Sequence, residues 1–303
     1  MSPPRTAGRR VEFRGGLESA DMHDPRVPET LEGWSVLHQV FRVRWPEWSA
    51  LGAAERKARA EGAAAVLAAM TGRDGATAAT TLLGHKGDLM LVHFRRGFEA
   101  LQKAQLEIAC GPLSGFLEQT TSYVSIVELG MYEMTAQIHG RIGGRGLEAG
   151  SAEYESAFDE EMGEQRRRVE GRLFLAVPPR RYVCFYPMNK RRGEDKNWYA
   201  VTFEERARMM RDHGMIGRRY AGAVSQIISG SIGFDDWEWG VDLFADDPVV
   251  FKKLIYEMRF DEASAHYAEF GPFYTGLQFS AEELPRFLDG EVPALHAPPG
   301  PAA

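Results

Sequence analysis

Apolar and polar residues alternate along residues 34–45, and this two-residue period predicts a half-buried strand. An alanine-rich segment at 55–70 follows, in which apolar positions recur at helical spacing, so we predict an amphipathic helix there. The other elements predicted in this half are strands at 80–84 and 88–94, joined by a turn at 84–87, a helix at 97–108 and a strand at 121–129. The predicted order is β-α-β-β-α-β.

The second half of the chain repeats this order. Its predicted elements are a short buried strand at 182–186, a helix at 203–214 that stops at a glycine, strands at 221–231 and 237–244, a helix at 249–267 and a closing segment at 271–279. An internal duplication of a ferredoxin-like unit is the simplest architecture for such a repeat. We therefore predict an α+β fold in which two antiparallel sheets bury their apolar faces and the helices lie outside.

The chain is divided by composition into four segments. We predict a flexible N-terminal tail (1–31), an N-terminal ferredoxin-like domain with a long connecting loop (32–170), a C-terminal ferredoxin-like domain (171–290) and a flexible C-terminal tail (291–303). Within the connection, 134–168, a glycine-rich run does not clearly join a strand to a helix, as a phosphate-binding loop would. We interpret it as a flexible connection or a ligand-gating loop rather than a nucleotide site.

Composition narrows the class of protein. With 303 residues, 44% hydrophobic and 26% charged, the chain is typical of a soluble globular protein. A net charge of −7 argues against a general nucleic-acid partner. The N-terminal segment has no apolar stretch suited to a secretory signal or a membrane span, and the two cysteines are compatible with a reducing compartment. We expect a cytoplasmic location.

Candidate chemistry begins where the strand at 182–186 ends. Tyr186 is followed by Lys190, Arg191 and Arg192, whose charges cannot be buried without partners. A buried strand thus delivers a tyrosine and several cations to a rim, which suits a polyanionic ligand; a solvated end of an edge strand is the alternative on these residues alone. His213 lies at the predicted helix end, where it is either a ligand or a cap for the helix dipole.

These residues resemble a known family. The run from Tyr186 through Pro-Met-Asn to Lys190, His213 before a glycine, Gln226, and the segments 257–260 and 271–276 are similar to the chlorite dismutase superfamily, and within it to the coproheme decarboxylase branch. The similarity covers roughly residues 34–288. It implies a dimeric α+β barrel within one chain, assembled as a homopentamer.

The resemblance also implies a site. His213 occupies the position of the proximal iron ligand, a role that neutral imidazole commonly fills. Gln226 stands where chlorite-decomposing members carry an arginine, and a neutral amide suits hydrogen peroxide as the oxidant. Glu262 is a candidate partner of the imidazole by proximity alone. The porphyrin-binding positions implied are Arg172, Met188, Lys190, Trp198, Gln226, Arg259 and Ser264.

The activity implied is hydrogen-peroxide-dependent decarboxylation of two propionates of Fe-coproporphyrin III (coproheme) to vinyls, giving haem b. Coproheme is then both substrate and cofactor, Tyr186 the radical-forming residue, and Lys190 the group that positions the second propionate. A transient contact with coproporphyrin ferrochelatase follows from the same pathway. The alternatives are another haem-dependent oxidoreductase of the chlorite dismutase or peroxidase type, and a haem carrier without turnover.

Overall fold

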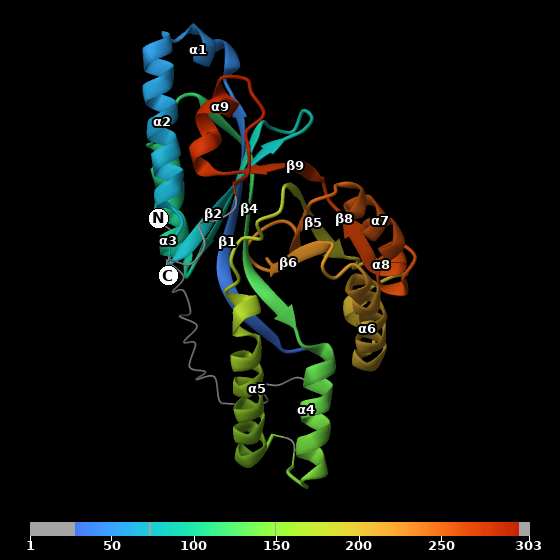
Figure 1. The fold of residues 1–303 in the computed structure, drawn as a ribbon. Helices are drawn as coiled ribbons and strands as arrows, with labels where there is room; N and C mark the ends of the chain where they lie inside the picture. The colour runs from blue at the N-terminus through green and yellow to red at the C-terminus, as the bar shows by residue number, and fades with distance from the viewer. Residues whose placement is uncertain (1–27, 73, 149, 297–303) are drawn as a thin grey trace, which may run out of the picture.

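The computed structural model describes residues 28–72, 74–148 and 150–296. Most of the two predicted tails lies outside these ranges, so their predicted flexibility stays a prediction there. The strands of the described ranges form one antiparallel sheet of nine strands (Figure 1).

The first half forms a ferredoxin-like unit. Its four strands are arranged in the order β4-β1-β3-β2, and all neighbours run antiparallel. The elements are β1 (Thr30–Val43), α1 (Trp45–Ala50), α2 (Ala53–Ala69), β2 (Gly75–Leu82), β3 (Leu89–Arg95), α3 (Phe98–Ala109) and β4 (Leu117–Gly130).

The second half repeats this arrangement, with its strands in the equivalent order β9-β5-β7-β6. The predicted duplication is confirmed. The elements are β5 (Tyr182–Lys190), the 3-10 helix η1 (Trp198–Ala200), α6 (Phe203–Arg219), β6 (Val224–Gly230), β7 (Trp239–Ala245), α7 (Val249–Met258), α8 (Glu262–Tyr267), β8 (Ala268–Phe270) and β9 (Tyr274–Phe279), followed by η2 (Ala281–Glu283) and α9 (Leu284–Leu288).

The two units join edge to edge. β4 pairs with β6 and β2 pairs with β9, so eight strands close into a barrel, while the short β8 pairs with the end of β5. Side chains from both units fill the interior, among them Val36, Phe94, Phe185 and Phe244. Helices α2 and α3 lie on one side of the barrel and α6, α7 and α8 on the other (Figure 1). The result is the single-chain α+β barrel that the resemblance implies.

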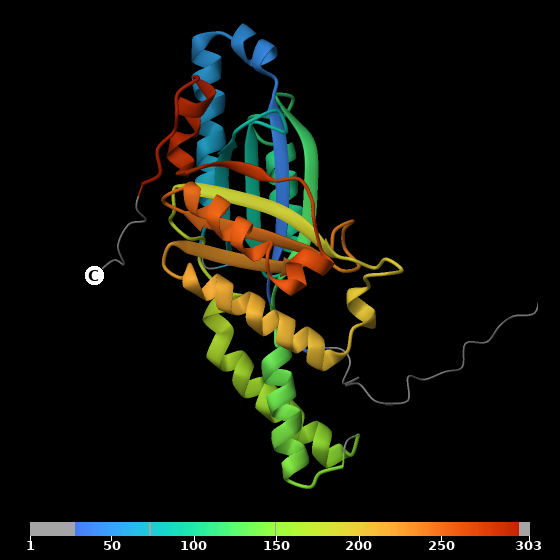
Figure 2. The ribbon, with the colours of Figure 1, turned by 90° about the vertical axis from the view of Figure 1, so that its right-hand side faces the viewer.

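The predicted loop at 134–168 is wrong. Helices α4 (Tyr132–Gly144) and α5 (Ala152–Leu173) form a hairpin that extends away from the barrel (Figures 1 and 2). Apolar residues at helical spacing build its core, including Ile138, Ile142, Phe158 and Met162. Glycine lowers helix stability by only about 1 kcal/mol, so burial of these residues outweighs the glycines that suggested a loop.

Two helix boundaries also differ from the prediction. The predicted helix at 249–267 is broken into α7 and α8, because the Asp261 carboxylate accepts a hydrogen bond from Ser264 N at 2.9 Å and begins a new helix. Helix α6 continues through Gly214 to Arg219, since Ile216 and Tyr220 still pack on the core beyond the glycine. In the described ranges no helix combines the length and apolar character needed to cross a membrane.

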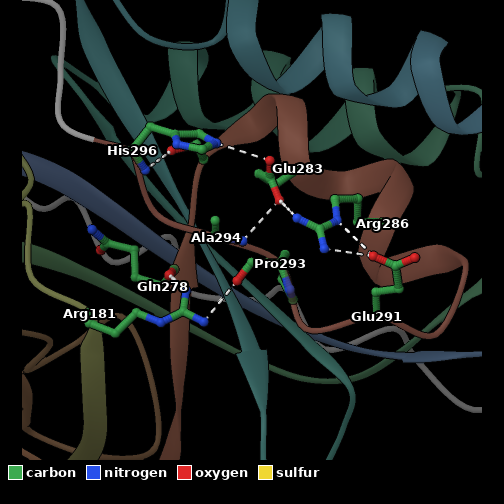
Figure 3. A network of polar contacts seen from close by, with 9 residues as sticks. Arg181, Gln278, Glu283, Arg286, Glu291, Pro293, Ala294 and His296 are labelled. Atoms are coloured by element: carbon green, nitrogen blue, oxygen red, sulfur yellow. Dashed lines mark hydrogen bonds and ion pairs between the residues drawn. The ribbon is translucent and has the colours of Figure 1, made fainter.

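Residues 291–296, expected in a flexible tail, are held on the barrel (Figure 3). Arg181 Nη2 donates to Pro293 O at 2.8 Å. The Glu283 carboxylate accepts from Ala294 N at 3.0 Å and contacts His296 Nε2 at 2.9 Å. These contacts are not visible in composition, which is why composition alone predicts a tail there.

The β2–β9 seam requires a glycine. A Cβ at Gly276 would lie 1.8 Å from Thr81 O, a backbone atom that cannot move without opening the seam. We expect Gly276→Ala to lower the free energy of unfolding by about 2 kcal/mol or more, measured by denaturant unfolding followed by circular dichroism.

Gly140→Ala is the matched control, because Gly140 lies in α4 with no atom within 4 Å of the added Cβ. We expect it to leave stability unchanged or to raise it by up to about 1 kcal/mol. Equal stabilities of Gly276→Ala and the unmodified protein would contradict this view of the seam.

Candidate active site

The outward face of β5 carries three of the predicted site residues. Side chains alternate along a strand, so Phe185 points into the barrel interior, while Tyr186, Met188 and Lys190 share the opposite face. Helices α6, α7 and α8 lie over this side of the second unit (Figure 2). The structure therefore places these side chains between the sheet and a layer of helices.

His213 lies on the inward-facing stripe of α6. Arg206, Met209, Ile216 and Tyr220 follow the same helical spacing and are buried or half-buried. The His213 side chain is 28% exposed, and its Nδ1 lies 2.9 Å from Asp261 Oδ2. With Nδ1 engaged by the carboxylate, Nε2 is the nitrogen available to a ligand.

Asp261 is the residue that orients this imidazole, so the suggestion of Glu262 is wrong. Burial alone would raise the pKa of the Asp261 carboxyl, but the hydrogen bond and charge of His213 and the donors of Ser264 hold it below its ordinary value. Glu262 instead forms an ion pair with Arg208 at 2.7 Å on the exposed side. The Asp-x-x-Ser spacing of a helix cap is the sequence signal that identifies Asp261.

Lys190 is buried beside the same carboxylate. Its Nζ lies 4.3 Å from the centroid of the Trp198 ring and donates to Ala263 O at 3.3 Å. Burial lowers the pKa of Lys190 to about 8, and the charges of Asp261 and Glu238 offset part of that shift. Lys190 is thus a partly desolvated cation near neutrality, suited to gaining or losing a proton.

Tyr186 is buried in an aromatic group. Its ring stacks on Phe273 with centroids 4.6 Å apart and lies 5.8 Å from Phe270. Burial raises the pKa of the phenol well above its ordinary value, although the Arg259 charge opposes this, so the hydroxyl keeps its proton at neutral pH. Among the described residues the hydroxyl has no hydrogen-bond partner, and Arg259 lies over the Phe270 ring at 5.0 Å.

Gln226 lies two strands away from Tyr186 on the same outward face. On this face of β6, Gln226 and Ile228 are exposed, with Ile228 at 39%. Helix α6 packs mainly on α4, α7 and α8 rather than on β6. The outward face of β6 is therefore not covered by α6.

Eight of the predicted site residues lie in the second unit: Tyr186, Met188 and Lys190 on β5, Trp198 on η1, His213 on α6, Gln226 on β6, Arg259 directly after α7 and Ser264 on α8. Arg172 is the exception. It lies exposed in the last turn of α5, which packs mainly on α4, β1 and β4. Across the described ranges no hydrogen bond or ion pair joins Arg172 to the other residues.

Two ferredoxin-like units closed into one barrel, with a histidine-bearing helix over the second unit, define the class of dimeric α+β barrels. A family model described as chlorite dismutase matches residues 56–279. The chain belongs to the chlorite dismutase family.

Similar proteins are known from several organisms. A relative from Natronomonas pharaonis is 42% identical over 274 residues, which are 89% of this chain and 43% of the relative. One from Haloquadratum walsbyi is 40% identical over 270 residues, 88% of this chain and 48% of the relative. Both carry the name "Putative heme-binding protein". The chain spans about half the length of these curated relatives.

Solved structures share the fold. A protein from Thermus thermophilus, described as a novel heme-binding protein, is 38% identical with a TM-score of 0.74, over 88% of this chain and 99% of that one. A chlorite dismutase from Candidatus Nitrospira defluvii is 16% identical with a TM-score of 0.64, over 85% of this chain and 95% of that one. At that identity the second comparison supports the fold alone.

The His213–Asp261 contact generates a pH-dependent prediction. Asn caps a helix as well as Asp does, so Asp261→Asn removes the charge and keeps the cap. We expect a loss of about 1–2 kcal/mol in the free energy of unfolding at neutral pH. The pKa of Asp261 is lower in the folded than in the unfolded protein, so its charge stabilises the fold only where the carboxyl is ionised. The difference in free energy of unfolding between the two proteins should therefore be complete above about pH 5 and shrink as the pH falls below about 4.

Urea unfolding of both proteins across this pH range measures the difference. Asp261→Ala, which also removes the cap, should lose about 1 kcal/mol more. If the difference in free energy of unfolding between Asp261→Asn and the unmodified protein stayed constant down to about pH 3, the assigned contact between the Asp261 charge and His213 would be contradicted.

Proposed function

We propose that this protein binds an iron porphyrin through His213 and performs hydrogen-peroxide-dependent decarboxylation of coproheme to haem b. The outward face of β6 supports an inserted planar ligand, because Gln226 and Ile228 are exposed there and α6, the helix that carries His213, does not pack on it. Within the described residues no three His, Cys, Asp or Glu side chains are arranged to hold a metal ion. A metal at His213 would therefore have to bring its other ligands with it, as the iron of a porphyrin does.

The polar groups around this face suit a ligand with several carboxylates. Lys190 and Arg259 supply positive charge at two places, one beside α8 and one at the end of α7. Ser264, next to the Asp261 cap, adds a hydroxyl. Charge-assisted hydrogen bonds of this kind are the strong ones for carboxylate recognition. The neutral Gln226 offers no fixed charge for an anionic oxidant, which favours peroxide over chlorite.

The reaction converts each propionate to a vinyl group and carbon dioxide, releasing two electrons and one proton. Together with one further proton from solvent, these reduce one hydrogen peroxide to two waters in each turnover. When bound, the iron porphyrin supplies the oxidising chemistry. Tyr186, protonated and without a hydrogen-bond partner in the described residues, gives up its hydroxyl hydrogen and then takes one from the propionate β-carbon. Arg259 and Lys190 hold the carboxylates so that this carbon lies beside the phenol.

One observation carries the proposal: a buried tyrosine and a buried lysine share the outward face of β5, and the carboxylate beside that lysine, Asp261, also holds His213. A protein that only binds the porphyrin needs the histidine and the cations, whereas hydrogen transfer also needs a buried, protonated phenol. The resemblance to the coproheme decarboxylase branch also supports a homopentamer, which analytical sedimentation would test. It supports as well a transient contact with coproporphyrin ferrochelatase, which a pull-down would test.

The test follows the porphyrin mass after ferric coproporphyrin III and hydrogen peroxide are added to the pure protein. We expect two successive losses, each of carbon dioxide and two hydrogens. Tyr186→Phe should bind coproheme with unchanged affinity and slow both losses by at least about a hundredfold, because the phenol is the only group proposed to transfer the hydrogen atom.

Tyr220→Phe is the matched control. Tyr220 also packs on the outer face of the second unit, but its hydroxyl bonds Glu257 at 2.8 Å, so decarboxylation should be unaffected. Normal turnover by Tyr186→Phe would overturn the role of the phenol. If the unmodified protein bound coproheme but the porphyrin lost no mass after peroxide was added, the result would support a haem carrier instead.

His213→Ala should weaken coproheme binding by about tenfold or more and change the absorption spectrum of the iron, because the axial imidazole is lost. Added free imidazole should restore the spectrum. His266→Ala is the control, since His266 is exposed on α8 and bonds no site residue in the described ranges. An unaltered spectrum for His213→Ala would show that another group binds the iron.

A further inference from the structure

The base of the α4–α5 hairpin touches the candidate active site. Tyr132, the first residue of α4, lies two residues beyond the end of β4, and its ring lies 5.8 Å from that of Phe203 at the start of α6. The ring also packs against the buried group formed by Trp198, Met209 and Ala263. The Arg206 guanidinium lies 5.9 Å from its centroid, so the Arg206 charge offsets part of the rise in pKa that burial gives this phenol.

Trp198 connects this ring to Lys190. The indole is 2% exposed and packs with Met209 and Ala263, and Tyr132 packs against this group. The indole face carries the Lys190 ammonium at 4.3 Å. The attraction between an ammonium and an indole face is strongest when both are desolvated, as they are here. A rotation of the indole would therefore move or rehydrate the ammonium.

We propose that Tyr132 is a positioning residue that locks the Trp198 indole and thereby orients Lys190 for the second propionate. The inference rests on the proposed decarboxylation and deepens it. The hairpin is then part of the active-site architecture at its base, although its outer end extends away from the barrel (Figure 1). Tyr132 itself touches neither the tyrosine nor the imidazole of the site.

The surroundings of Lys190 explain why the first and second steps should differ. Asp261 faces it from the α7–α8 junction, and Glu238, which also pairs with Arg192 at 3.6 Å, faces it from the start of β7. The Trp198 face and Ala263 O supply its other contacts. Tyr186 belongs to the separate aromatic group with Phe273. Loosening the indole should then disturb the step that depends on Lys190 and spare the first.

The experiment compares Tyr132→Ala, which removes the ring that packs against the Trp198 group, with the unmodified protein in two measurements. In the decarboxylation assay, we expect the first mass loss to stay within about twofold and the second to slow by about ten- to a hundredfold, the scale set by small misplacements of a reacting group. The three-propionate intermediate should accumulate. In the ligand-free protein, 13C NMR titration of the lysine side chains, with Lys190→Arg to assign the resonance, should show the Lys190 midpoint rising by about one pH unit toward the ordinary value near 10.4.

Tyr154→Ala is the matched control. It removes another tyrosine ring of the same hairpin, one that bonds His139 Nδ1 and lies in the hairpin core. We expect it to change neither measurement. This control separates a loss of hairpin stability from a loss of the Trp198 contact.

Each outcome decides the inference. Unchanged step ratios and an unchanged Lys190 midpoint in Tyr132→Ala overturn it, and so does an equal slowing of both steps by Tyr132→Ala and Tyr154→Ala. If the unmodified protein fails to decarboxylate coproheme, the proposed function falls. The Lys190 titration then decides alone whether Tyr132 controls the ammonium.

Discussion

Pairing of strand edges between the two ferredoxin-like units is the constraint on which the molecule depends. Each unit alone would leave two unpaired strand edges, and burying or exposing such edges is unfavourable. The β4–β6 and β2–β9 pairings remove all four edges and enclose one core filled from both halves. Because the barrel is closed, its outward faces are the surfaces left for helices, and most of the candidate site residues lie on or beside one of them.

The two outward faces differ in how they are covered. On the first unit, α2 and α9 pack over an apolar group that includes Trp48, Leu67 and Leu284. On the second, α6 is held by α4, α7 and α8 and leaves the outward face of β6 uncovered. Both outward faces therefore carry a packed apolar group, which on the second unit includes Tyr186, Leu243 and Phe251, while Gln226 and Ile228 of β6 stay exposed.

Electrostatics in the second unit centres on one carboxylate. Asp261 caps α8, bonds His213 and faces Lys190. A single buried charge thus orients an imidazole and keeps a desolvated ammonium from losing its proton too readily. The break between α7 and α8 is what places that carboxylate there, so a feature of helix capping becomes a feature of the site.

The sequence by itself determined the repeated β-α-β-β-α-β order, the family, and most of the candidate residues, because period and local motif are properties of neighbouring positions. Tyr186, Met188 and Lys190 share a face simply because strands alternate. Only the tertiary structure decided that 134–168 is a helical hairpin, that Asp261 rather than Glu262 holds His213, and that Arg172 lies away from the other predicted residues. Each of these depends on contacts between segments far apart in the chain, where packing outweighs weak local propensity.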